Sequence, residues 1–91
     1  MKSYTKIYLD YFNYGIEENI PCEYCGSVAV DIAHIVPKSK FGKKRIHERD
    51  DITNLCALCR NCHYKYDFEN KISRDEIREA HRRTMEGNRR Y

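Results

Sequence analysis

Two pairs of cysteines are the first residues in this sequence whose types and spacing suggest chemistry. Cys22 and Cys25 form one pair, Cys59 and Cys62 form the other, and 33 residues separate the pairs. A two-residue gap lets both thiolates of a turn face one ion, and two such turns supply four sulfurs in a tetrahedron. This donor set suits zinc. Because four thiolates leave no open position for a substrate, we expect the zinc to be structural.

A fifth cysteine, Cys56, stands outside both pairs and is expected to be a small buried hydrophobe. The odd number of cysteines argues against a fully paired disulfide framework. The alternative for the two pairs is that they are redox thiols or buried apolar side chains. Their regular spacing favours metal binding over that alternative.

Three further polar residues accompany the cysteines: His34 and Asn54 between the pairs, and His63 directly after Cys62. On a scaffold clamped by zinc, side chains of these types are suited to hydrolysing a phosphodiester. Each also has a plainer interpretation, because Asn is common in turns and a His after a cysteine pair can cap a helix or face solvent. His47 and His81 fit no pattern, and we expect both on the surface.

Two segments of the chain carry a resemblance to a known family. The first is Asp31-Ile32-Ala33-His34-Ile35-Val36-Pro37, and the second is Asn54-Leu55-Cys56-Ala57-Leu58-Cys59-Arg60-Asn61-Cys62-His63. With the upstream cysteine pair, and in this order, they resemble the zinc-knuckled branch of the HNH nuclease family, which includes phage, mobile-element and restriction enzymes. The resemblance covers residues 20 to about 68.

The resemblance implies a small α+β protein with a ββα-metal core, in which a hairpin and a helix grip one catalytic divalent ion. A zinc site of four cysteines would clamp this core, and helices would flank it on both sides. We expect a single HNH-type domain over residues 1–91 that hydrolyses DNA phosphodiester bonds. The implied products are a 5′-phosphate and a 3′-hydroxyl.

In the family's scheme, the last residue of the first strand is the general base, which maps onto His34. A neutral imidazole can take a proton from water as it attacks phosphorus. Asn54 would brace the loop between the strands, and His63 would bind the catalytic ion. Many relatives have His-His or Asp-His at the end of the first strand, so Ala33 stands here where a metal ligand is usual.

We expect Asp31, His63 and Asp67 to bind the catalytic ion instead. His63 and Asp67 stand at i and i+4 on the expected helix, so they share one face. Strand alternation puts Asp31 on the side of Ala33, over which it could reach. Two carboxylates and one imidazole favour Mg²⁺ or Mn²⁺. In the alternative, Asp31 faces solvent and Asn54 or water completes the shell.

The net charge of +3 is modest, but a basic stretch follows the first strand. Its members are Lys38, Lys40, Lys43, Lys44 and Arg45. We expect these residues, helped by arginines near the C-terminus, to grip DNA phosphates without reading bases. The plainer interpretation is that the charges keep a small domain in solution. A second hypothesis for function is a non-catalytic zinc module that binds nucleic acid, which Ala33 favours, and a third is a purely structural zinc knuckle.

The elements that must position these residues follow from periodicity and turn signals. We expect a helix over 3–14 with Ser3 as N-cap and Gly15 as its stop, because apolar residues recur there at helical spacing. Ser73 and Glu76 fit the capping box of a final, loosely packed helix that ends before Gly87. Between these helices we expect a strand over 28–35, a polar loop over 38–49, a second strand or an extended return over 51–58, and a helix from 60 to about 70.

Length and composition set the remaining limits. A chain of 91 residues with 41% hydrophobic and 34% charged residues makes one small domain, and domains of this size often add a metal. No apolar run approaches the ~18 residues of a membrane span, and the charged N-terminus does not resemble a signal peptide. We therefore expect a reducing, intracellular, cytoplasmic location and no membrane. Because a chain this short has little surface for reading a long recognition sequence, we expect weak specificity or help from a protein partner or a dimer.

Overall fold

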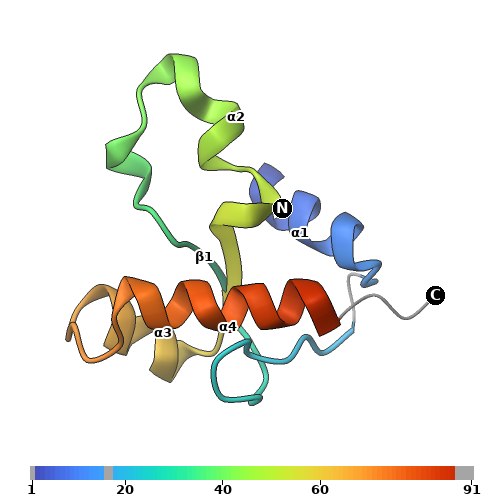
Figure 1. Ribbon diagram of the computed structural model, residues 1–91. Helices are drawn as coiled ribbons and strands as arrows, with labels where there is room; N and C mark the ends of the chain where they lie inside the picture. The colour runs from blue at the N-terminus through green and yellow to red at the C-terminus, as the bar shows by residue number, and fades with distance from the viewer. Residues whose placement is uncertain (1, 16–17, 88–91) are drawn as a thin grey trace.

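The computed structural model describes residues 2–15 and 18–87, and it has the expected α+β composition (Figure 1). Its helices and strands, in chain order, are α1 (Ser3–Phe12), β1 (Asp31–His34), α2 (Ile46–Arg49), β2 (Leu55–Leu58), α3 (Arg60–Asp67) and α4 (Arg74–Gly87). Two strands followed directly by a helix make up the expected ββα core. None of the helices in the described ranges is both long enough and apolar enough to cross a membrane.

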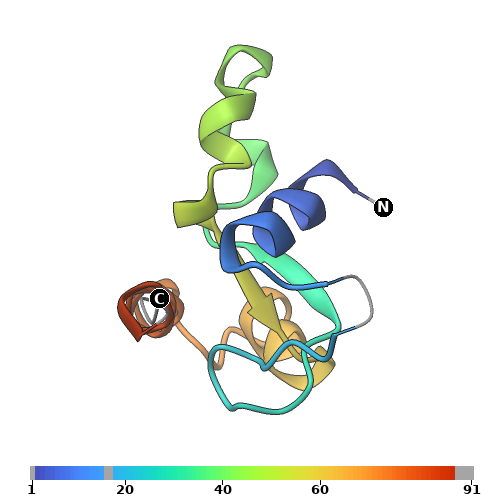
Figure 2. The same ribbon diagram turned by 90° about the vertical axis from the view of Figure 1, so that its right-hand side faces the viewer.

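The antiparallel hairpin of β1 and β2 lies at the centre, with Asp31 opposite Leu58 and His34 opposite Leu55. All four residues of β2 are buried, because the strand is covered on both faces. Leu55 and Ala57 pack against Tyr8 and Phe12 of α1. The alternate residues, Cys56 and Leu58, pack against the cysteine cluster and α4. Figure 2 shows α1 and α4 on different sides of this hairpin.

The first strand is shorter than the predicted span of 28–35. Val28 forms an isolated bridge with Pro21, and Val28 and Val30 are more than half exposed. The β-rich run is therefore shared between two partners. Its beginning pairs with the segment before the cysteine turn, where Ala29 N–H donates to Ile20 C=O (2.7 Å), and only its end pairs with β2. The second strand also starts late, because Ile52–Asn54 form a 3-10 turn.

The prediction of a polar loop over 38–49 is wrong. The segment contains two 3-10 turns, Lys38–Lys40 and Lys43–Arg45, and the second leads directly into α2. Together they form an arm that projects from the rest of the molecule, drawn in green at the top of Figure 1. Short helical turns satisfy backbone groups locally, so this segment needs no apolar residues of its own to be ordered.

The predicted caps of α1 are also wrong. Ser3 is the first helical residue and Lys2 occupies the N-cap position without a side-chain hydrogen bond. The helix stops at Asn13, whose φ of 61° is left-handed, rather than at Gly15. Asn tolerates this conformation better than most residues because its short polar side chain can bond locally.

The capping box of α4 is confirmed: Ser73 N–H donates to Glu76 Oε1 and Glu76 N–H donates to Ser73 Oγ, both at 3.1 Å. The prediction that His81 lies on the surface is wrong, since its exposed fraction is 4%. His81 stands one turn after the fully buried Ile77 and shares its face. Helix α4 is therefore anchored more firmly than its few apolar residues indicated.

The imidazole of His81 is buried because both of its nitrogens have partners. Nε2 donates to the carbonyl of Ile52 (2.8 Å), and Nδ1 lies 2.7 Å from Glu23 Oε1. The other oxygen of Glu23 accepts from Ala57 N–H (3.1 Å) and from the hydroxyl of Tyr8. Burial and the neighbouring carboxylate raise the pKa of the Tyr8 phenol, so it remains a donor. One carboxylate thus joins α1, the first cysteine turn, β2 and α4.

We predict that His81→Ala lowers the free energy of unfolding by about 3 to 5 kcal/mol, because it leaves the Glu23 carboxylate buried without the imidazole that pairs with it. Urea denaturation followed by circular dichroism measures this loss. His47→Ala is the matched control: His47 is exposed on α2, and its loss is expected to change stability by no more than about 0.5 kcal/mol. Equal effects of the two substitutions would contradict this account of the buried pair.

Candidate functional site

The four paired cysteines form one cluster at the end of the hairpin. Their sulfur atoms all lie within 4.8 Å of one another, and Cys25 Sγ lies 3.6 Å from Cys59 Sγ. The first turn closes through Gly26 N–H, which donates to Cys22 C=O (2.9 Å), and Gly26 has a left-handed φ of 85° that only glycine adopts readily. Cys59 is the N-cap of α3, so the second pair opens that helix.

This cluster fits a tetrahedral metal ion. Zn–S bonds of about 2.3 Å place ligand sulfurs about 3.8 Å apart, close to the separation of Cys25 and Cys59. Hydrogen bonds from the side chain and backbone of Ser27 lower the pKa of Cys25 to about 6, which favours the thiolate that binds metal. Cys56, as expected, is fully buried outside the cluster, and burial raises the pKa of its thiol.

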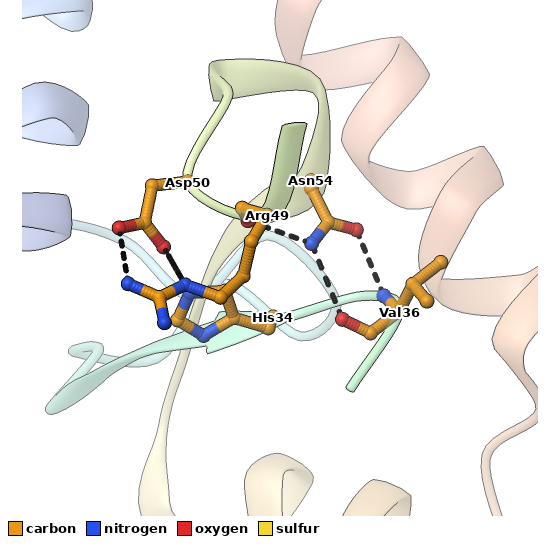
Figure 3. A network of polar contacts seen from close by, with 5 residues as sticks. All are labelled: His34, Val36, Arg49, Asp50 and Asn54. Atoms are coloured by element: carbon orange, nitrogen blue, oxygen red, sulfur yellow. Dashed lines mark hydrogen bonds and ion pairs between the residues drawn. The ribbon is translucent and has the colours of Figure 1, made fainter. Parts of the chain in front are cut away.

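His34, the last residue of β1, is held by a buried carboxylate (Figure 3). Its Nε2 lies 2.9 Å from Asp50 Oδ1, and the two side chains are 7% and 8% exposed. Arg49 donates two hydrogen bonds of 2.9 Å to Asp50. These bonds, led by those of Arg49, lower the pKa of Asp50 to about 2, so Asp50 is a carboxylate that accepts the Nε2–H of His34.

Burial lowers the pKa of His34 below its ordinary value of 6.5, although Asp50 opposes this effect. His34 is therefore neutral at neutral pH, with its proton on Nε2 and a free lone pair on Nδ1. The ring of Tyr4 from α1 contacts it edge to face, with ring centroids 4.6 Å apart. Lys38 Nζ lies 5.0 Å from the centre of the same tyrosine ring.

Asn54 is buried and fastens both ends of the arm, as Figure 3 shows. Its Oδ1 accepts from Val36 N–H (2.8 Å), and its Nδ2 donates to the carbonyls of Val36 (3.2 Å) and Arg49 (2.9 Å). All of its side-chain polar atoms are engaged with backbone. Asn54 therefore holds Val36 and Arg49, which lie close in the chain to His34 and Asp50. Because its side chain is fully engaged in these bonds, no group of Asn54 is directed at an ion.

His63, on α3, lies between the two carboxylates expected to join it. Its Nδ1 is 3.2 Å from Asp31 Oδ2, and its Nε2 is 2.6 Å from Asp67 Oδ2. The fold thus brings Asp31, His63 and Asp67 into contact. The two carboxylates face opposite nitrogens of His63. Within the described residues, the ligand atoms of these three side chains therefore do not all lie within 4.8 Å of one another, whereas those of the four cysteines do. If one nitrogen bound an ion, the carboxylate on the other would fix the ring, as is common for metal-bound histidines.

A surface groove of about 440 Å³ connects the two histidines. His34 and Ala33 of β1 line it together with His63 and Asp67 of α3, and Tyr4 and Lys38 lie at its sides. The imidazole of His34 and the His63–Asp67 pair therefore face the same space. Such a groove can receive a phosphodiester between them.

The basic residues expected to contact DNA lie on the arm, and all five are exposed. Lys38 is nearest the groove, which it lines. Arg45 is partly engaged, because it forms an ion pair with Glu48 and lies over the ring of Phe41, 5.2 Å from its centre.

Sequence reasoning missed Asp50, Arg49 and Tyr4 as neighbours of His34. Asp50 and Arg49 stand in a run of charged residues, which is typical of solvent-exposed surface. Tyr4 belongs to an apolar helical pattern, which predicts a core residue. The adjacent acids Asp50 and Asp51 were the only indication in the sequence of a buried carboxylate. Asp51 has a local partner, because it accepts a hydrogen bond from Thr53 N–H (3.0 Å), whereas Asp50 pairs with His34.

Comparison with known protein families identifies the family to which this chain belongs. The family model of HNH endonucleases matches residues 22–69, which is more than half of the chain. Searches of curated proteins and of solved structures found no match. The matched span begins at Cys22 and includes the hairpin, the arm, both histidines of the groove and the second cysteine pair. With this match and the clustered cysteine knuckles, the chain belongs to the HNH endonuclease family.

Proposed function

We propose that this protein is a metal-dependent endonuclease that hydrolyses phosphodiester bonds of DNA, with His34 as general base and residues 1–91 acting as one domain. The observation that carries this proposal is the groove shared by His34 and the His63–Asp67 pair. A base and metal-ligating groups that line one groove are what hydrolysis of a phosphodiester requires.

In this mechanism, Asp50 holds the Nε2–H of His34, so the lone pair of Nδ1 accepts a proton from water. The water oxygen forms its bond to phosphorus as the bond from phosphorus to the 3′ oxygen breaks, and the leaving oxygen takes a proton from solvent to become the 3′-hydroxyl. Asp50 stabilises the imidazolium that results, and Arg49 keeps Asp50 ionised. Asn54 and Tyr4 hold these groups in place.

The residues proposed for the catalytic ion are Asp31, His63 and Asp67: because the carboxylates face opposite nitrogens of His63, an ion on one nitrogen would lie beside one carboxylate, and the other carboxylate would orient the ring. A hard divalent cation such as Mg²⁺ or Mn²⁺ would polarise the scissile phosphate and stabilise the leaving oxygen. The side chains fit such an ion in type, since they supply carboxylate oxygens and one imidazole. The structural ion proposed for the four cysteines is Zn²⁺, whose ligand preference matches four thiolates.

A second candidate function is a zinc-stabilised module that binds nucleic acid without cleaving it. Two observations favour it: Ala33 occupies the position of a usual ligand, and both nitrogens of His63 already contact carboxylates. Cleavage of supercoiled plasmid that depends on Mg²⁺ or Mn²⁺ supports the nuclease. Binding without any cleavage supports the module.

We predict that Cys59→Ser removes zinc and unfolds the chain. Structural zinc supplies on the order of 10 kcal/mol, comparable to the whole stability of a small domain. Elemental analysis and circular dichroism of the purified protein measure both effects. Cys56→Ala is the matched control, because Cys56 is buried outside the cluster, and this variant should keep one zinc per chain. A folded Cys59→Ser protein without zinc would refute the structural role of the ion.

We predict that His34→Ala lowers the turnover number about 10²- to 10⁴-fold and leaves DNA affinity nearly unchanged, because the base acts only in the transition state. For the unmodified protein, turnover should rise with pH through a pKa below 6.5 and then level off, since the base must be neutral and burial lowers the pKa of His34. Plasmid nicking across a pH series measures both quantities.

Asp50→Asn tests whether His34 acts as this base. Loss of the carboxylate removes a contribution that raises the pKa of His34, so the rise in turnover should move to lower pH while the plateau falls. A variant that folds, binds DNA and keeps both the plateau and the midpoint of the unmodified protein would assign the base elsewhere.

We predict that replacing Lys43, Lys44 and Arg45 by Ala flattens the dependence of DNA affinity on salt. Each phosphate neutralised contributes about −0.9 to the slope of log K against log salt. Fluorescence anisotropy at several salt concentrations measures the slope. A second variant replaces Arg82 and Arg83, which are exposed on α4 and paired with Glu79, and tests the contribution expected from arginines near the C-terminus. A slope that changes in this second variant but not in the first would place the DNA-binding surface on α4 and not on the arm.

A further inference from the structure

Two aromatic side chains stand in the open on α3 without a role in the core. Tyr64 is 49% exposed and Phe68, which directly follows the helix, is 74% exposed. Their rings lie against each other, with centroids 5.3 Å apart and planes inclined by 33°. Tyr66, by contrast, packs against the core next to the cysteines.

These rings run beside the candidate ion ligands. Tyr64 directly follows His63 and Phe68 directly follows Asp67, so the aromatic pair and the ligand pair form two neighbouring rows along one turn of the chain. A hollow of about 650 Å³ is lined by Tyr64, Phe68 and His63, and its lining also includes Asp31, Arg60 and Asn61. His63 lines both this hollow and the groove that contains His34.

We propose that Tyr64 and Phe68 form a stacking platform for an unpaired nucleobase next to the scissile phosphate, so that the preferred substrate is single-stranded or locally unpaired DNA. This proposal rests on the proposed nuclease function and specifies its substrate class. Every base has a flat π face that stacks on aromatic rings, but in a duplex both faces of each base are already stacked. The platform therefore favours bases outside a duplex.

The charges around the hollow suit this occupant. Asp31 repels phosphate from its part of the hollow, so a DNA backbone can approach there only where a cation offsets this charge. Arg60 can contact a neighbouring phosphate or stack on a base, and Asn61 offers an amide to a base edge.

A helical protein-binding face is a poorer explanation of the same rings. Such faces present apolar anchors at i, i+3, i+4 and i+7, whereas the exposed large apolar side chains of α3 and the residue after it are Tyr64 and Phe68 alone, at i and i+4. The exposed rings are bordered by charged and amide side chains rather than by an apolar surround.

The test measures equilibrium binding in the His34→Ala background with Mg²⁺, using a labelled oligonucleotide as a single strand and as a duplex of the same sequence. Gel analysis after each measurement verifies that the DNA is intact. Phe68→Ala and Tyr64→Ala should each weaken single-strand binding about 5- to 150-fold and leave duplex binding within about 2-fold. Tyr64→Phe should keep the unmodified affinity, and Phe68→Leu should lose as much as Phe68→Ala.

Tyr11→Ala is the matched control, because Tyr11 is 53% exposed and lies on α1. It should change neither affinity. Equal losses on single strand and duplex, rescue by Phe68→Leu, or a change in oligomeric state without a change in single-strand affinity would each overturn the platform. Plasmid nicking by the unmodified protein is scored separately, so a protein that fails to cleave but shows the selective loss sinks the nuclease and retains the platform.

Discussion

An isolated hairpin of two four-residue strands is at best marginally stable in water, and the four cysteine sulfurs converge where this hairpin meets α3. Cys59 ends β2 and caps α3 in a single step, so the direction of α3 relative to the hairpin is set where the sulfurs meet. The first cysteine turn supplies the other two sulfurs of the cluster. It also places Glu23 beside β2, where Glu23 exchanges hydrogen bonds with Ala57. Removing this convergence would release α3, and with it His63, from the strand that carries His34.

Glu23 extends that constraint to the segments outside the family match. Its carboxylate reaches Tyr8 of α1 and His81 of α4, so both flanking helices are tied to the cysteine turn through one buried group. Helix α1 in turn places Tyr4 against His34. The flanks are therefore part of the site's construction, because the wall beside the proposed base comes from a helix that lies outside residues 22–69.

The arm between the strands adds the second half of the site. Asn54 fixes the two points at which the arm leaves and rejoins the core, and Asp50 then falls next to His34. A buried histidine that faces an ionised carboxylate on one nitrogen has only the other nitrogen free to accept a proton. Asn54 therefore supports the proposed base: it positions the arm that carries Asp50, and Asp50 decides which nitrogen of His34 holds the proton.

The sequence by itself determined the cysteine cluster, the hairpin followed by a helix, the capping box of α4 and the family, because each depends on residue types at short, fixed spacings. Such short-range patterns can be recognised in the sequence without knowing how distant segments pack. Only the tertiary structure decided that His81 is buried, that the arm is helical, and that Asp50, Arg49 and Tyr4 surround His34. These contacts join residues that are 16 to 58 positions apart or lie in a charged run without periodicity, and no local pattern marks a polar side chain whose partner arrives from a distant segment. Asp31, His63 and Asp67 lie between these cases: helical spacing predicts that the last two are neighbours, whereas the arrival of Asp31 at the same imidazole depends on how the hairpin packs on α3.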